Sequence, residues 1–455
     1  MTNDNPDANS ASPDAPKTVD APRPNVDAPP TGPATRVWVY GDFLTNNTTQ
    51  LGTFVHESAQ MPVTMTGIPS TGKLYDLLGT PFSINANGTK IAYVADSTVA
   101  GRWDLFLADA DGGNAVTVTT AVNTATITDP SFSPDGTKLA FVSDRDVATQ
   151  KDIYVVDAAA SSTPVRVSPA RNNVALDASS FVWSPDSKLL AMTGDFATDA
   201  RYALWTVDTT AATPAPVQVL TDAENLATTP NGVLSPGPKW VSNTKVVFYG
   251  ALTAAGDRHL YVATAGTAGV TELASTAITR ADSTKAEAHV FGISPDLSKI
   301  VFSSDGITAT AFELYVANTD GTGTPTRLTA GTTRAGSDLD GFEELAFSPD
   351  GMKVAVVADW GATDAKYEPY VVSLAGGDLH RVAIPGDPID AMRDASKLQW
   401  TRGGAKLYFR ADGGATDNEF GLWVANPVMT DGTATLAVSA PVNGDVSGVI
   451  TRDVP

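Results

Sequence analysis

The chain contains no cysteine, few charged residues and no long apolar run. Without cysteine, disulfides, thiolate metal sites and cysteine nucleophiles are excluded. No stretch reaches the roughly 18 apolar residues that a membrane helix needs, and no signal peptide begins at Met1. Charged residues make up only 18% of the 455, and the formal net charge is −21. Such a surface repels nucleic acid and anionic membranes, and it suits cationic partners or Ca²⁺.

Turn formers and β-formers are plentiful. There are 38 glycines and 30 prolines, and Val, Thr, Ile, Tyr and Phe recur in short runs. This composition favours an all-β fold with many turns. The chain is too long for an ordinary single core, so it either splits into domains or is built from repeats.

Residues 1–34 differ from the rest, because Pro, Asp and Ala dominate and large apolar residues are nearly absent. Such a segment cannot bury enough surface to offset its ordering entropy, so we expect a disordered spacer. Its composition resembles the spacers that follow the lipidated cysteine of secreted bacterial lipoproteins. That resemblance implies a lipid anchor in the native precursor and a periplasmic, outer-membrane-anchored or extracellular location. An ordinary disordered terminus fits the same composition.

Residues 35–455 repeat one pattern of a tight turn, a lysine and three β-runs. The lysines recur at steps of 48, 50, 57, 54, 54 and 53 residues, at Lys90, Lys138, Lys188, Lys245, Lys299, Lys353 and Lys406. Near-constant spacing of this length predicts a solenoid or propeller.

A further copy is split between the two ends of the chain. Residues 36–43, 50–57 and 62–67 match three strands of a copy, and residues 446–454 match the strand that precedes the turn. A closed β-propeller of four-stranded blades, whose first blade is completed by residues 446–454, explains this division and removes exposed sheet edges. We expect eight blades, or seven if the split copy is not a blade.

The turn reads Ser-Pro-Asp-Gly at 133–136 and 348–351, and Ser-Pro-Asp-x in two further copies. Proline presets φ, aspartate bonds its own backbone and glycine accepts a positive φ, so we expect these aspartates to be structural. With the Lys-Leu-Ala-Phe and Asp-Ile-Tyr-Val-Val-Asp runs that follow at 138–141 and 152–157, the copies resemble the WD40-like (PD40) repeat of TolB-type propellers. The same repeat forms the N-terminal propellers of prolyl-oligopeptidase-like proteins. The resemblance covers the folded part, and it implies the fold rather than one function.

No catalytic motif stands out. A Gly-x-Ser-x-Gly elbow and phosphate loops are absent, and the four histidines fall in different copies, at His56, His259, His289 and His380. We therefore expect no catalytic residues and no organic cofactor. The favoured function is a non-catalytic protein-binding or scaffolding propeller of the bacterial cell envelope. The alternatives are a carbohydrate- or peptide-processing enzyme with its site in the central funnel, and a Ca²⁺-stabilised structural protein.

Acidic loop residues supply the candidate sites. Loops between the second and third strands share one face of a propeller with the blade connections, and a ring of carboxylates there focuses negative potential. The candidates for binding a protein or peptide partner, cationic in character, are Asp144, Asp146, Asp195, Asp199, Asp359, Asp364, Asp412 and Asp417. One blade connection also begins an Asp-x-Asp-Gly pattern, although full EF-hand spacing is missing. The candidate Ca²⁺ ligands are Asp338, Asp340, Glu343 and Glu344.

Overall fold

The fold is known from a computed structural model, which describes most of the chain beyond residue 34. The described residues are 35–41, 50–55, 63–64, 82–95, 103–119, 126–159, 163–170, 177–198, 201–225, 232–234, 237–253, 256–280, 285–308, 311–329, 344–358, 367–377, 379–384, 395–412, 420–427, 432–438 and 446–453. Their secondary structure is almost wholly β, with one 3-10 turn, η1 (Ala274–Thr276). The spacer expected at 1–34 lies outside the described residues.

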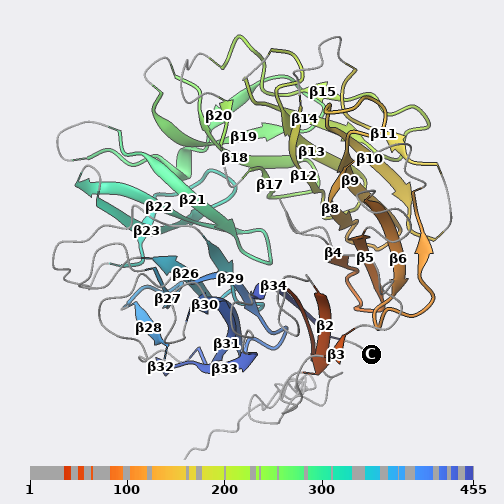
Figure 1. Ribbon diagram of the computed structural model, residues 1–455. Coiled ribbons are helices and arrows are strands. Elements are labelled where there is room, and N and C mark those ends of the chain that lie inside the picture. Colours follow the sequence, from red (N-terminus) through yellow and green to blue (C-terminus); the bar gives the residue numbers. More distant parts are fainter. Residues whose placement is uncertain are drawn as a thin grey trace, which may run out of the picture. The chain divides into compact units, whose positions relative to one another are not determined.

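The described strands form eight sheets arranged around a centre (Figure 1). Seven sheets are built from strands that follow one another along the chain, and the eighth joins the two ends. In each consecutive sheet the first strand lies innermost and the last outermost, and successive strands pair antiparallel. The expected all-β propeller of four-stranded blades is confirmed.

The first four consecutive sheets occupy residues 82–272. Their strands are β4 (Phe82–Ile84), β5 (Lys90–Ala95), β6 (Asp104–Asp109), β7 (Val116–Thr117); β8 (Ile127–Phe132), β9 (Lys138–Ser143), β10 (Asp152–Asp157), β11 (Val165–Arg166); β12 (Ala178–Trp183), β13 (Leu189–Gly194), β14 (Ala203–Asp208), β15 (Val217–Gln218); β16 (Gly232–Val233), β17 (Lys239–Trp240), β18 (Lys245–Ala251), β19 (Arg258–Thr264) and β20 (Val270–Glu272).

The other three consecutive sheets occupy residues 288–438. Their strands are β21 (Ala288–Ile293), β22 (Lys299–Thr308), β23 (Ala311–Asn318), β24 (Thr326–Arg327); β25 (Leu345–Phe347), β26 (Lys353–Ala358), β27 (Glu368–Ser373), β28 (His380–Ala383); β29 (Ala395–Trp400), β30 (Leu407–Asp412), β31 (Phe420–Ala425) and β33 (Thr435–Val438). The short β32 (Gly432–Thr433) pairs in parallel with β28.

The eighth sheet brings the ends of the chain together. Strand β34 (Val446–Asp453) pairs antiparallel with β1 (Thr35–Gly41), with Trp38 opposite Ile450. β2 (Gln50–Val55) and β3 (Val63–Thr64) complete it, and dark blue β34 therefore lies near red β2 in Figure 1. Trp38 is fully buried, and its Nε1 donates to the carbonyl of Ala110 at 3.1 Å. That bond fastens the eighth sheet to the sheet of β4–β7.

The Ser-Pro-Asp turns are structural, as their repetition indicates. The Ser133 hydroxyl donates to the Asp135 carboxylate at 2.6 Å and accepts the N–H of Lys138 at 3.0 Å. The equivalent bonds recur at Ser184, Ser294 and Ser348. In one copy Leu189, rather than Lys188, bonds the turn serine, so the lysine there lies one residue before the position that the repeat assigns to it.

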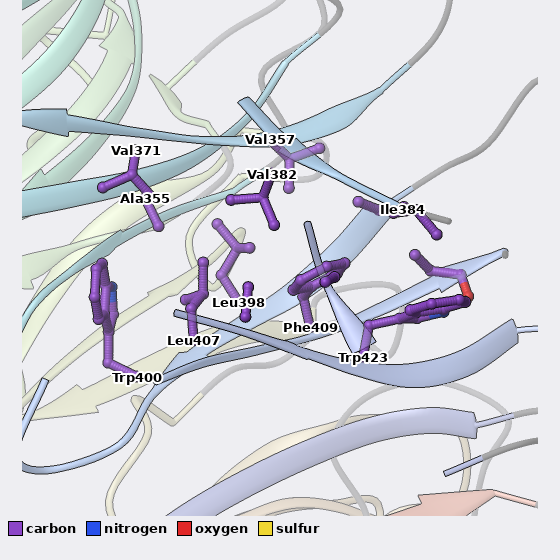
Figure 2. Packing of buried hydrophobic residues seen from close by; sticks show 14 residues of the cluster. Ala355, Val357, Val371, Val382, Ile384, Leu398, Trp400, Leu407, Phe409 and Trp423 are labelled. Atoms are coloured by element: carbon purple, nitrogen blue, oxygen red, sulfur yellow. The ribbon is translucent and has the colours of Figure 1, made fainter. Parts of the chain in front are cut away.

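The core lies between the sheets rather than inside any one of them. The middle strands are buried on both faces, as in β9, where Leu139 through Ser143 are all buried, and this explains their continuous apolar runs. Figure 2 shows one such contact. Trp400, Phe409 and Trp423 of one sheet pack with Val357 and Val382 of the sheet before it. Each sheet therefore depends on its neighbours for burial.

Candidate functional site

The loop face is the end of the ring that carries the links from second to third strands, such as residues 144–151, and the links between sheets, such as 219–225. Three acids near the ends of second strands bind backbone there: two directly follow β9 and β13, and the third lies in β22. Asp144, Asp195 and Asp305 accept the N–H of Thr126, Asp177 and Glu287 at 2.6, 2.7 and 2.8 Å. Each donor lies 18 residues earlier, directly before an innermost strand. These carboxylates fix the start of that strand.

A second set of residues, buried or partly buried, lies in the first half of the third strands and contacts residues of the outermost strands or just beyond them. Asp152 accepts from the Ser168 hydroxyl at 2.5 Å, Glu313 accepts from the Thr329 hydroxyl, and Glu368 pairs with Arg381. His259 takes this position in another sheet, with Nδ1 3.7 Å from Glu272. Burial lowers its pKa. The loop acid Glu313 and the histidine His259 therefore have structural contacts within their own sheets.

The structure describes part of the proposed partner-binding set. Asp144 and Asp195 hold backbone, Asp146 is exposed in the loop after β9, and Asp412 ends β30. Asp199, Asp359, Asp364 and Asp417 lie outside the described residues. The described members therefore share the loop face, and only Asp146 among those with described side chains is exposed there.

The proposed Ca²⁺ ligands are described at one position only. Asp338, Asp340 and Glu343 lie outside the described residues, whereas Glu344 directly precedes β25. The Glu344 carboxylate accepts the N–H of Lys397, and burial raises its pKa. Within the described ranges, no group of three His, Asp or Glu side chains is placed to hold a metal ion. The Glu344 carboxylate is attracted by the positive charges of Lys397 and Lys239.

A pocket of about 370 Å³ opens between the innermost strands β4, β8 and β12. Hydroxyl groups and aromatic rings dominate its walls, which are formed by Phe82, Ser83, Asp129, Pro130, Ser131, Val142, Ser179, Ser180 and Phe181. Asp129 has a φ of 54°, a conformation that is uncommon outside glycine and in which Asp and Asn are enriched. It lies where the pairing of β8 with β9 shifts register. Bulges of this kind change the direction in which side chains point, and here the residues of the bulge form part of the pocket wall.

The innermost strands also end their sheets. β4, β8 and β12 are each the terminal strand of their sheet, so one edge of each has no ladder partner. Side chains bond part of these edges, because the Ser83 hydroxyl accepts the N–H of Phe132 at 3.3 Å and the Trp183 indole donates to the carbonyl of Ser131 at 3.2 Å. A polar pocket beside the rest of these edges can accept both the side chains and the main chain of an extended segment.

The remaining histidines do not converge on this pocket. The His289 ring packs against the Phe312 ring in a tilted arrangement, with centroids 4.1 Å apart, and its Nε2 lies 3.4 Å from the Glu287 carboxylate. Burial lowers the pKa of His289. His380 lies in the outer strand β28 opposite Val371, and His56 lies outside the described residues. The pocket residues were missed from the sequence because they differ from sheet to sheet. The available signal was their position, within the few residues that precede each turn.

Comparison with known proteins supports the fold alone. No family model and no curated protein matches the sequence. A structure from a study of two prolyl endopeptidases aligns with a TM-score of 0.50 and 14% identity, over 78% of this chain and 49% of that one. This chain thus spans about half the length of that enzyme.

Two further structures are similar at lower scores. The propeller domain of the Trilobed protease from Pyrococcus furiosus aligns with a TM-score of 0.47 and 12% identity, over 79% of this chain and 97% of that domain. TolB from Acinetobacter baumannii aligns at 0.37 and 16%, over 90% of this chain and 82% of TolB. The chain is a β-propeller with neighbours among enzymes and among other proteins.

Proposed function

We propose that this propeller is a non-catalytic binding module of the bacterial cell envelope, and that it takes an extended, basic peptide segment of a partner protein. The observation that carries the proposal is the pocket between β4, β8 and β12, where Asp129 stands among hydroxyl groups beside open strand edges. The loop-face end of β8 carries Asp129, so a basic side chain entering from that end meets a carboxylate.

The charge of the chain supports a basic partner. The formal net charge is −21, and the exposed acids Asp146, Asp222 and Asp257 lie in links of the loop face. A field of this sign raises the association rate of cationic segments. The buried acids Asp152, Asp305 and Glu368 are bound to Ser168, Arg280 and Arg381 within the sheets, so they contribute to the fold.

The envelope location rests on the composition of residues 1–34 and on the repeat resemblance. None of the described segments forms a helix of the length and apolarity required for a membrane crossing. A lipid anchor in the native precursor would place the propeller at a membrane surface, with the spacer between them.

Fluorescence anisotropy with two labelled peptides tests the binding role. One alternates glycine with lysine and the other alternates glycine with glutamate. We expect the lysine peptide to bind and the glutamate peptide not to bind, with affinity falling as salt rises. Asp129→Asn should weaken the lysine peptide roughly tenfold, the scale of one hydrogen bond to a charged group. Asparagine tolerates the positive φ, so the pocket keeps its shape.

Asp111→Asn is the matched control. Asp111 is exposed in the hairpin that joins β6 to β7, on the opposite end of the ring, and its Oδ1 accepts the N–H of Gly113 at 2.9 Å. Asparagine preserves that acceptor while removing the same charge. If both variants lose the same affinity for the lysine peptide, the effect comes from net charge and not from the pocket. If the two peptides bind the wild type equally well, the proposal is wrong.

A further inference from the structure

Two irregular inner strands shape the pocket between β4, β8 and β12. The pairing of β8 with β9 shifts register around Asp129, and the pairing of β12 with β13 shifts register around Ser179. Both residues line the pocket. A residue left out of the ladder by a bulge is released from the regular alternation of its strand. Polar residues from two neighbouring sheets therefore meet at one pocket.

Hydrogen-bond acceptors lie on each of the three strands. Among the lining residues that the structure describes, Asp129 on β8 alone carries a charge. The Ser83 hydroxyl on β4 accepts the N–H of Phe132 at 3.3 Å. The Ser180 hydroxyl on β12 pairs with that of Thr193 at 2.7 Å. Because a hydroxyl oxygen has two lone pairs, each of these serines keeps at least one for a further donor.

The remainder of the pocket wall is apolar. Phe82, Pro130 and Val142 are buried. Phe181 is partly buried and packs against the core between the sheets of β8–β11 and β12–β15. A cation that enters such a pocket loses part of its hydration. The guanidinium group is more weakly hydrated than an ammonium group and packs favourably on aromatic faces, so the loss costs arginine less than lysine.

The size of the pocket suits a single long side chain. Its volume of about 370 Å³ lies at the lower end of the range for ligand pockets, roughly 300–1,000 Å³. The planar head of arginine carries five N–H donors in a fixed fork, whereas lysine presents three donors from one nitrogen atom. Since the acceptors lie on three different strands, a fork can reach more than one of them at once.

We propose that the pocket selects arginine over lysine in the bound segment. The Asp129 carboxylate accepts from the guanidinium group, the hydroxyls of Ser83, Ser179 and Ser180 accept its remaining N–H groups, and the Phe181 ring packs on its plane. This inference rests on the proposed peptide-binding function and deepens it by naming the residue that the pocket recognises. The negative net charge attracts both cations equally, so the preference arises in the pocket.

Three labelled peptides, compared by fluorescence anisotropy, test the preference on the unaltered protein. Glycine alternates with arginine in the first, with lysine in the second and with citrulline, the uncharged analogue of arginine, in the third. We expect the arginine peptide to bind about fivefold to tenfold tighter than the lysine peptide, the scale of one cation–π contact with an added hydrogen bond. The citrulline peptide should bind more weakly than either.

The outcomes separate this inference from the function on which it rests. If the lysine peptide binds as tightly as the arginine peptide, the selectivity is wrong and the peptide-binding role stands. If the citrulline peptide binds as tightly as the arginine peptide, recognition of the charged guanidinium group is wrong. If none of the three binds, the proposed function itself is wrong.

Phe181→Leu is compared with Tyr202→Leu to locate the preference. Tyr202 directly precedes β14 on the loop face, is 40% exposed and lies outside the pocket lining. Phe181→Leu should bring the affinities for arginine and lysine close together, whereas Tyr202→Leu should keep the wild-type ratio. Ser179→Ala changes an exposed position and should weaken the arginine peptide about fivefold and the lysine peptide less. An unchanged ratio in both pocket variants overturns the proposal.

Discussion

Removing residues 446–455 deprives β1 of its inner partner. The pairing of β34 with β1 spans seven residue pairs, and at roughly 1 kcal/mol per ladder hydrogen bond its loss costs about 7 kcal/mol. Drawing together ends about 400 residues apart costs on the order of 5 kcal/mol, so the pairing exceeds that cost by a small margin. The total stability of a domain is typically about 5–15 kcal/mol. The truncated chain loses the pairing but no longer bears the closure cost, so we expect its free energy of unfolding to fall by about 2 kcal/mol.

Guanidinium unfolding, followed by tryptophan fluorescence and circular dichroism, measures the loss. A synthetic peptide of residues 446–455 should restore the midpoint of the truncated chain in a concentration-dependent way, because it binds the folded form alone. A peptide of the same composition in scrambled order is the control. If truncation leaves the unfolding midpoint unchanged, the closing strand does not hold the ring and the reasoning fails.

Three further predictions concern single residues. Hydrogen bonds from Ser294 and Ser298 lower the pKa of Asp296 from 3.8 to about 2, so the contribution of this carboxylate to stability is complete above pH 3.8 and is lost as the pH falls toward 2. The Tm difference between the wild type and Asp296→Asn should therefore shrink across that range, and a constant difference would refute the assignment. Asp195→Ala should lower the free energy of unfolding by about 1–3 kcal/mol in urea, since it orphans the N–H of Asp177, whereas exposed Asp146→Asn should change it by less than about 0.5 kcal/mol. Gly292→Ala should cost about 1–3 kcal/mol because its Cβ meets Leu345, and Gly403→Ala, with open space around its Cβ, should have little effect if crowding is the cause.

What recurs along the chain could be predicted from the sequence. The Ser-Pro-Asp turns return at near-constant spacing, and each rests on local hydrogen bonds such as that from Ser133 to Asp135. Their chemistry is contained within a few neighbouring residues, so the pattern predicts both the turn and the strand that follows. The β34 strand was visible for the same reason, because residues 446–454 resemble an inner strand.

The residues of the candidate functional site were harder to predict from the sequence. The sequence predicts Asp144 and Asp195 as surface acids, yet they bind the backbone N–H groups of residues 18 positions earlier. Every residue except proline carries such an N–H group, so the sequence does not show which residue is the donor. Asp129 was not predicted because its position in the repeat holds different residues in the other sheets. The repeat pattern identifies the positions that are alike in every copy, whereas the pocket residues occupy positions that differ between copies.

The sheet shared by both ends also sets an order of events. During synthesis β1, β2 and β3 leave the ribosome before the seven other sheets, and the strand that covers the edge of β1 follows all of those sheets along the chain. While they are made, that edge stays open to pairing with other chains. Synthesis of β34 is therefore the step that ends its exposure to misassembly, and a product that stops short of β34 keeps an open edge.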